Sequence, residues 1–138
     1  MWLEPHSPLT PSTPGDVLAA IRAAGAPETA VRLIAAQAAY ETAGFVHGLW
    51  GWNIGNITQP NRQAAVYLPG NTLPFAHYPD LNAGAKAMVD LLTAHGVVAK
   101  APDLSAYVDA LKAMGYAGDA DYSAYKLGMA NWLLKLPT

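Results

Sequence analysis

Hydrophobic residues recur at helical spacing through most of the chain, and a glycine directly follows most of these stretches. The spacing predicts helices over 16–24, 27–43, 85–95, 104–114 and 122–134. In each stretch, apolar side chains three and four positions apart share one face, which can be buried against other helices. The pattern therefore predicts a mostly helical protein.

The stretch 27–43 differs from the others because its interior is so rich in alanine. It opens with proline and glutamate, which are both favoured in the first turn of a helix. Val31, Ile34 and Ala38 share one face, and small side chains let neighbouring helices approach closely. We expect this to be the central buried helix, with Glu41 in its last turn.

Residues 44–82 have a different character, being rich in glycine, asparagine, proline and aromatic residues. Short runs with strand-like composition occupy 64–68 and 74–78, around a Pro-Gly-Asn turn at 69–71. We read a small irregular lobe that holds a hairpin. The predicted fold class is therefore α+β, mostly helical, with a cleft between the β lobe and the helical core.

The chain has the length of one domain, at 138 residues. Four prolines within residues 1–14 predict an extended lead-in, and residues 15–138 then form a single domain. The first residues do not resemble a secretory signal, and no apolar run approaches the ~20 residues of a membrane-spanning helix. We expect no membrane partner.

Charge and composition exclude several classes of function. The formal net charge is -2 and the basic residues are scattered, which argues against nucleic acid as a partner. The chain has no cysteine, and its four histidines have no spacing typical of a metal site. Neither a serine-nucleophile elbow nor a phosphate-binding glycine loop occurs. We expect no metal and no cofactor.

Glu41 is the first candidate for chemistry. A carboxylate in the last turn of a helix faces the negative end of the macrodipole, where ionisation is disfavoured by a few tenths to ~1 kcal/mol. Tyr40, Phe45, Trp50 and Trp52 lie nearby in sequence, and an apolar surround would raise the pKa of this carboxyl further. Such a group suits general acid catalysis near neutral pH. The alternative is a solvated glutamate that merely ends a helix.

The segment after this helix combines aromatic and amide side chains. Trp50, Trp52, Asn53 and Asn56 could stack on the apolar faces of sugar rings and hydrogen-bond to their hydroxyl and acetamide groups. Alternatively, the tryptophans seal the lobe against the helical core. Both interpretations stay open at this point.

Three segments in order resemble the bacterial glucosaminidase family, which belongs to the lysozyme-like superfamily and includes flagellar peptidoglycan hydrolases and autolysins. Residues 35–44 read AAQAAYETAG and resemble the family's catalytic helix end. Residues 52–57 read WNIGNI and are similar to its Asn- and Gly-bearing loop. Residues 115–122 read GYAGDADY and are similar to its "G-Y-A-T-D-P-x-Y" signature. The likeness extends over about residues 28–134.

The resemblance implies a lysozyme-like fold with a glycan cleft and hydrolysis of a β-1,4 bond beside an N-acetylated sugar. Glu41 matches the catalytic acid, and Tyr116 matches an active-site tyrosine that orients a water or steadies developing charge. Trp52, Asn53 and Tyr122 would help to hold the glycan. For both tyrosines, the alternative is core packing at a helix junction.

The chain also departs from the family pattern. Ala43 stands where the family usually has glycine, and Gly118 and Ala120 replace the threonine and proline of its signature. These changes leave open which bond is cut.

The segment from 42 to 79 supplies no carboxylate, so Asp80 is the nearest candidate in sequence for a second catalytic carboxylate. Otherwise the enzyme would use the substrate's acetamide, a water held by Tyr116, or the substrate's 6-hydroxyl, as a lytic transglycosylase does.

The expected partner is therefore peptidoglycan. A hydrolase of the same fold that acts on chitin, and a wall-binding virion component without turnover, remain as alternatives. Without a recognisable signal, action at the cell wall would fit a phage lysin, a virion-associated enzyme or a fragment of an exported protein.

Overall fold

The computed structural model of the chain describes residues 12–42, 44, 52–55, 65–66, 75–76, 78–115 and 122–137. In chain order the elements are α1 (Pro14–Ala23), α2 (Glu28–Glu41), β1 (Ala65–Val66), β2 (Phe75–Ala76), α3 (Leu81–Ala94), the 3-10 helix η3 (Val98–Lys100), α4 (Leu104–Ala113) and α5 (Tyr122–Lys135). The helices predicted from the hydrophobic spacing are confirmed, with ends that differ by a few residues. None of the described helices is long and apolar enough to cross a membrane.

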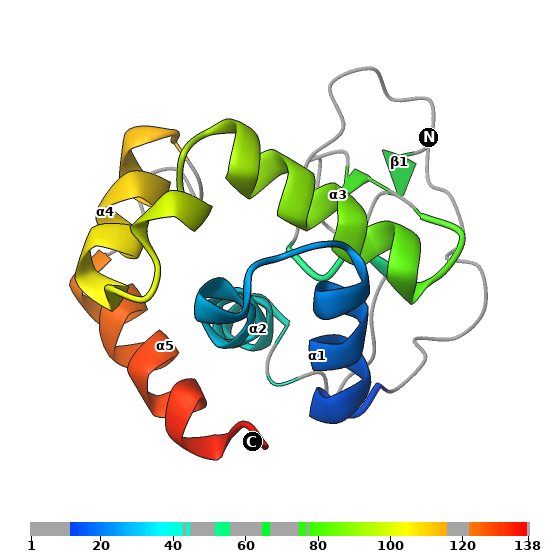
Figure 1. Cartoon of the computed structure of the whole chain (residues 1–138), viewed down its shortest axis with the longest axis horizontal. Coiled ribbons are helices and arrows are strands. Elements are labelled where there is room, and N and C mark those ends of the chain that lie inside the picture. The colour runs from blue at the N-terminus through cyan, green and yellow to red at the C-terminus, as the bar shows by residue number, and fades with distance from the viewer. Residues whose placement is uncertain are drawn as a thin grey trace.

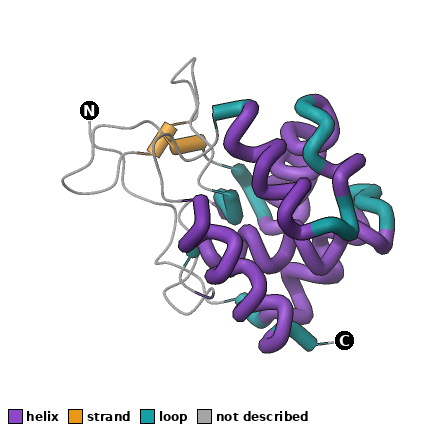
Figure 2. The backbone as a smooth tube through the Cα atoms, turned by 90° about the vertical axis from the view of Figure 1, so that its left-hand side faces the viewer, coloured by secondary structure: helices purple, strands orange, loops and turns teal. Residues whose placement is uncertain are grey.

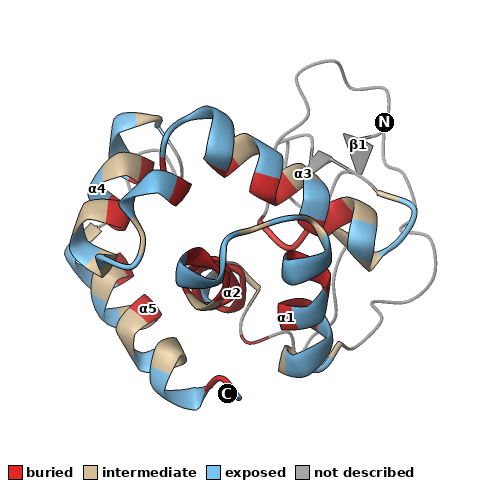
Figure 3. Cartoon of the chain, in the orientation of Figure 1, coloured by how far each residue is buried: buried red, intermediate tan, exposed pale blue. Residues whose placement is uncertain are grey.

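Helix α2 occupies the centre of the fold. Figure 1 looks along its axis, with α1, α3, α4 and α5 arranged around it. Residues 33–39 are all buried, so this stretch is covered on every side (Figure 3). Most of these residues are alanines, whose small side chains allow the surrounding helices to come close. The prediction of an alanine-rich central helix is confirmed.

Most of the larger core side chains come from the helices that surround α2. Each of those helices is buried on one face and exposed on the other, as Figure 3 shows. The buried side chains with the greatest volume include Ile21 of α1, Met88 and Leu92 of α3, Tyr107 and Leu111 of α4, and Tyr125 and Met129 of α5. Large residues on the outer helices therefore fill the space that the alanines of α2 leave.

The predicted α+β fold class is wrong. In the described part of the chain, β structure amounts to one antiparallel pair of two-residue strands, with Ala65 opposite Ala76 and Val66 opposite Phe75. This pair lies to one side of the helices (Figure 2). Strands this short form too few ladder hydrogen bonds to make a layer with its own buried face. The core is helical, and the short apolar runs did not signal full strands because periodicity is ambiguous at that length.

Helix starts are set by polar caps. Thr13 caps α1 by accepting from the backbone amide of Asp16, whose carboxylate accepts from the Thr13 amide in return. Asp80 and Asp103 cap α3 and α4 in the same position. The cap at Asp80 explains why α3 begins ahead of the predicted start at 85. Residues 1–11 of the expected lead-in lie outside the described residues.

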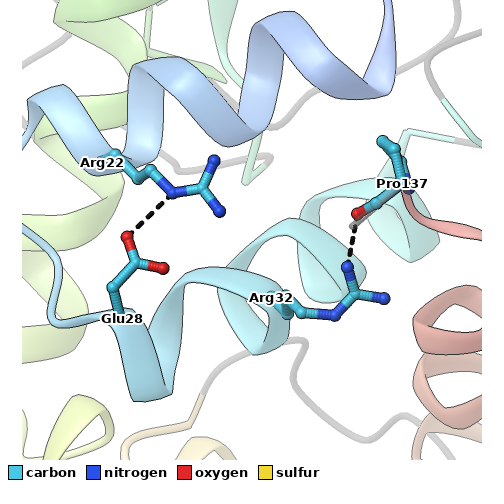
Figure 4. A network of polar contacts seen from close by, with 4 residues as sticks. All are labelled: Arg22, Glu28, Arg32 and Pro137. Carbon is cyan, nitrogen blue, oxygen red and sulfur yellow. Dashed lines mark hydrogen bonds and ion pairs between the residues drawn. The ribbon is translucent and has the colours of Figure 1, made fainter.

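Arg32 ties the central helix to the end of α5. Its Nη2 donates to the carbonyl oxygens of Leu133 at 2.7 Å and Leu136 at 3.3 Å, and its Nη1 donates to that of Pro137 (Figure 4). The last carbonyls of a helix have no partner within the helix, and a cation there also compensates the negative end of the macrodipole. Arg32 therefore both caps α5 and fixes it against α2.

The nearby contact between Arg22 of α1 and Glu28 of α2 is of a different kind. Arg22 Nε lies 2.8 Å from Glu28 Oε1, and both side chains are largely exposed to water (Figure 4). Exposed ion pairs contribute between 0 and about 1 kcal/mol.

We predict that Arg32→Met lowers the free energy of unfolding by about 1.5–3 kcal/mol, because it removes charged hydrogen bonds from partly buried carbonyls. Arg22→Met, the matched control, should lower it by less than about 1 kcal/mol. Urea denaturation followed by far-ultraviolet circular dichroism measures both values. An equal decrease in the two variants would contradict the capping role of Arg32.

Candidate active site

Glu41 is the last residue of α2 and is partly buried. Its Oε1 accepts a hydrogen bond of 2.7 Å from the hydroxyl of Tyr125 on α5. The helix ends here because Thr42 leaves the helical conformation, and its hydroxyl donates to the carbonyl of Ala38 at 2.8 Å. The carboxylate therefore lies where the end of the central helix meets α5.

A group of tyrosines lies beside this carboxylate, and we call Tyr40, Tyr122 and Tyr125 the tyrosine cluster. The Tyr40 and Tyr125 ring centroids are 4.5 Å apart and the rings are tilted. The Tyr122 and Tyr125 rings are stacked at 6.1 Å, and Lys112 Nζ lies 5.9 Å from the Tyr122 ring centroid. Tyr125 is only 2% exposed, whereas Tyr40 is 37% exposed. The cluster therefore runs from the interior to the surface next to Glu41.

Two glycines allow the end of α2 to approach α5 closely. A methyl group at Gly128, within α5, would overlap the ring of Tyr40. Glycine inside a helix is unfavourable by about 1 kcal/mol relative to alanine, but here it lets the ring lie against the helix backbone. At Gly44, a methyl group would overlap the ring of Trp132, and its φ of +77° also favours glycine.

Glu41 lies in the last turn of a helix, unlike the other carboxylates of the described residues. The others cap helix N-termini or pair with basic side chains. The caps are Asp16, Asp80 and Asp103, and the ion pairs are Glu28 with Arg22, Asp90 with Lys86, and Asp109 with Lys126. Glu41 instead ends a helix, where the macrodipole disfavours its ionised form, while the Tyr125 hydroxyl stabilises that form. Its position has no evident benefit for helix stability.

Asp80, the predicted candidate for a second carboxylate, has an observed structural role. Its Oδ1 accepts from the backbone amide of Ala83 at 2.8 Å, and the residue is exposed at the start of α3. A catalytic role for Asp80 stays a prediction.

Trp52 lies against α1 and α3, where its backbone carbonyl oxygen is close to Gly84. Trp52 has a φ of +56° and borders an open hollow of about 600 Å³. The other described residues that line the hollow are Ser12, Asp16, Ala19, Ala20, Ala23, Leu81 and Asn82. Asn53 is buried, with 3% exposed. The hollow beside Trp52 does not include Glu41, and the role of Trp52 and Asn53 in sugar binding stays a prediction.

The remaining predicted site residues divide into two groups. Tyr122 begins α5 and belongs to the tyrosine cluster, so the structure does bring it close to the partner of Glu41. Trp50, Asn56 and Tyr116 lie outside the described residues. Among described residues, no group of three or more histidine, aspartate or glutamate side chains could hold a metal ion.

Sequence reasoning missed Tyr125 as a site residue. Tyr125 lies within the stretch 122–134 that the spacing predicts as a helix, and its burial places it on the apolar face. Its hydroxyl reaches a carboxylate 84 residues earlier in the chain. A buried tyrosine needs a hydrogen-bond partner for its hydroxyl, so a tyrosine on an apolar helix face indicates that such a partner exists. The sequence does not show that this partner is Glu41.

A similar hydrogen bond lies one helical turn earlier on α2. The hydroxyl of Tyr107, on α4, donates to Gln37 Oε1 at 2.6 Å, and both residues are fully buried. Gln37 Nε2 has no hydrogen-bond partner in the described part of the chain. Two tyrosine hydroxyls from different helices thus reach successive turns of one face of α2.

Burial also affects Tyr78, just ahead of α3. Desolvation raises the pKa of its hydroxyl, because burial disfavours the charged phenolate.

Comparison with solved structures identifies a similar fold. The chain resembles the glycoside hydrolase domain of FlgJ from Salmonella typhimurium, with a TM-score of 0.59 and 22% sequence identity. The likeness covers 91% of this chain and 89% of that one. The chain has the fold of a glycoside hydrolase domain. No protein-family profile matches the chain, and no curated protein matches it in sequence.

We predict that Gly84→Ala destabilises the fold by about 1–3 kcal/mol, because a methyl group at this position of α3 would overlap the backbone carbonyl oxygen of Trp52. Gly15→Ala, in α1, is the matched control, since the nearest atom to its methyl would be 3.8 Å away. It should leave stability unchanged or raise it by up to about 1 kcal/mol. Thermal unfolding compares them, and a stable Gly84→Ala variant would contradict the close approach of Trp52 to α3.

Proposed function

We propose that this chain cleaves the glycan strands of peptidoglycan, hydrolysing a β-1,4 bond beside an N-acetylated sugar with Glu41 as the general acid. The observation that carries the proposal is the position of Glu41. It ends the buried central helix, and its Oε1 is held by a buried tyrosine hydroxyl. The fold is shared with a domain described as a glycoside hydrolase.

The surroundings of Glu41 suit an acid that gives up a proton near neutral pH. The helix end and partial burial disfavour the ionised carboxylate, which favours a proton-donating role for this group. In glycoside hydrolysis such an acid protonates the leaving oxygen as the glycosidic bond breaks. The Tyr125 hydroxyl then stabilises the carboxylate that remains.

The proposed substrate rests on two lines of support. The sequence segments that end α2 and precede α5 resemble the glucosaminidase family, whose members act on peptidoglycan. The cluster beside Glu41 also contains Tyr40 and Tyr122, whose rings are not fully buried. Partly exposed aromatic rings next to an acid suit the apolar faces of sugars.

For the second catalytic group, we favour the substrate's acetamide or a positioned water over a protein carboxylate. Two-carboxylate glycosidases place the partner ~5 to 10 Å from the acid. The other described carboxylates cap helices or form ion pairs, and Asp80 caps α3. Tyr116, which matches the family's active-site tyrosine, is our candidate for holding such a water.

We predict that Glu41→Gln lowers the rate of fragment release from purified peptidoglycan sacculi about 100- to 10,000-fold, because the amide cannot donate the catalytic proton. Glu28→Gln is the matched control. Glu28 lies in the first turn of the same helix, and its substitution disrupts an exposed ion pair with Arg22. This variant should retain the native rate. Liquid chromatography with mass spectrometry quantifies the fragments.

The chemistry of the new ends identifies the reaction. Reducing glucosamine or muramic acid ends indicate hydrolysis and identify the bond that is cut. Anhydro-muramic ends would indicate lytic transglycosylation instead. If the native protein pellets with sacculi but releases nothing, the catalytic proposal is wrong and wall binding takes its place. Cleavage of chitin oligosaccharides without cleavage of sacculi would indicate that the substrate is chitin and not peptidoglycan.

A further inference from the structure

The hydrogen bond between Tyr125 and Glu41 holds one oxygen of the carboxyl group. We propose that Tyr125 is a positioning residue: its hydroxyl holds Oε1 of Glu41 and so fixes the orientation in which the carboxyl group delivers its proton to the substrate. This inference rests on the proposed function, because it assigns a role within the same site. It adds a residue that neither the sequence motifs nor the structural comparison indicates.

The geometry of the Tyr125 side chain indicates a stable hydrogen bond to Glu41. The hydroxyl lies 2.7 Å from Oε1, and Tyr125 is almost fully buried. Its ring packs between those of Tyr40 and Tyr122, which restricts rotation of the side chain. The packed ring therefore keeps the hydroxyl beside the end of α2.

Close packing between α2 and α5 supports this placement. Gly128 lies one helical turn after Tyr125, and its lack of a side chain lets the Tyr40 ring lie on α5. The Tyr40 ring in turn covers one side of the Tyr125 ring. A glycine that is unfavourable for the helix thus allows the packing that holds the anchor in place.

The hydrogen bond to Oε1 affects how Glu41 donates its proton. A carboxyl group whose Oε1 is held by a hydrogen bond keeps one orientation, so its proton is presented to the substrate in a constant direction. During cleavage the proton passes from Glu41 to the glycosidic oxygen, which keeps the electron pair of the breaking carbon–oxygen bond. Glu41 becomes a carboxylate, and the Tyr125 hydrogen bond strengthens as the charge develops. Tyr125 keeps its own proton throughout.

The chain offers a matched control for this bond. Tyr107 also donates a buried hydroxyl to α2, one turn earlier, but its acceptor is the Gln37 amide oxygen at 2.6 Å. Replacing either tyrosine by phenylalanine removes one hydroxyl and keeps the ring. The two variants therefore differ in whether the hydrogen bond that is removed reaches the catalytic acid.

We predict that Tyr125→Phe lowers kcat about 10- to 100-fold, because the acid loses its fixed orientation and the stabilisation of its charge. KM should stay near the native value, since Tyr125 is buried and acts through Glu41. The measurement is the initial rate of cleavage of soluble, uncross-linked glycan strands over a range of concentrations. Tyr107→Phe should retain the native kcat, and circular dichroism with thermal unfolding checks that both variants are folded.

Several outcomes would overturn the positioning role while leaving the proposed function intact. These are an unchanged kcat in folded Tyr125→Phe, a rise in KM with kcat retained, or an equal fall of kcat in both phenylalanine variants. Failure of the proposed function is recognised separately, because the native protein itself would then cleave neither sacculi nor soluble strands.

Discussion

Close packing around an alanine-rich helix is the constraint on which the rest of this structure depends. Residues 33–39 of α2 are buried on all sides, and the outer helices supply the large side chains that fill the core. Interiors are packed at nearly crystalline density, so a larger side chain on α2 would push a neighbouring helix outward. The small side chains of α2 thus set how closely α1 and α5 approach it.

Because other helices surround α2, polar groups along it find partners on those helices. Arg32 reaches the carbonyls at the end of α5, Gln37 accepts from Tyr107 of α4, and Glu41 accepts from Tyr125 of α5. Buried polar groups are costly when unpaired, so each contact also specifies how the helices are placed. The packing that forms the core therefore also aligns the groups around Glu41.

The candidate acid, Glu41, is the last residue of the central helix α2. A carboxylate at the C-terminal end of a helix is placed against the macrodipole, and the other described carboxylates occupy favourable caps or ion pairs. Unfavourable placement of a charged group is typical of sites where chemistry outweighs stability. The tyrosine cluster then supplies both the anchor for the carboxylate and an aromatic surface beside it.

The sequence by itself determined the helices and the place of Glu41 at a helix end, because helical periodicity and caps are local properties that extend over many residues. It overestimated the strands, since runs as short as 64–68 carry too little periodicity to separate a strand from irregular structure. Only the tertiary structure decided that Trp52 lies by α1 and α3, and that Tyr125 holds Glu41 across 84 residues of chain. Such contacts depend on how helices pack, and no local pattern encodes which buried hydroxyl meets which carboxylate.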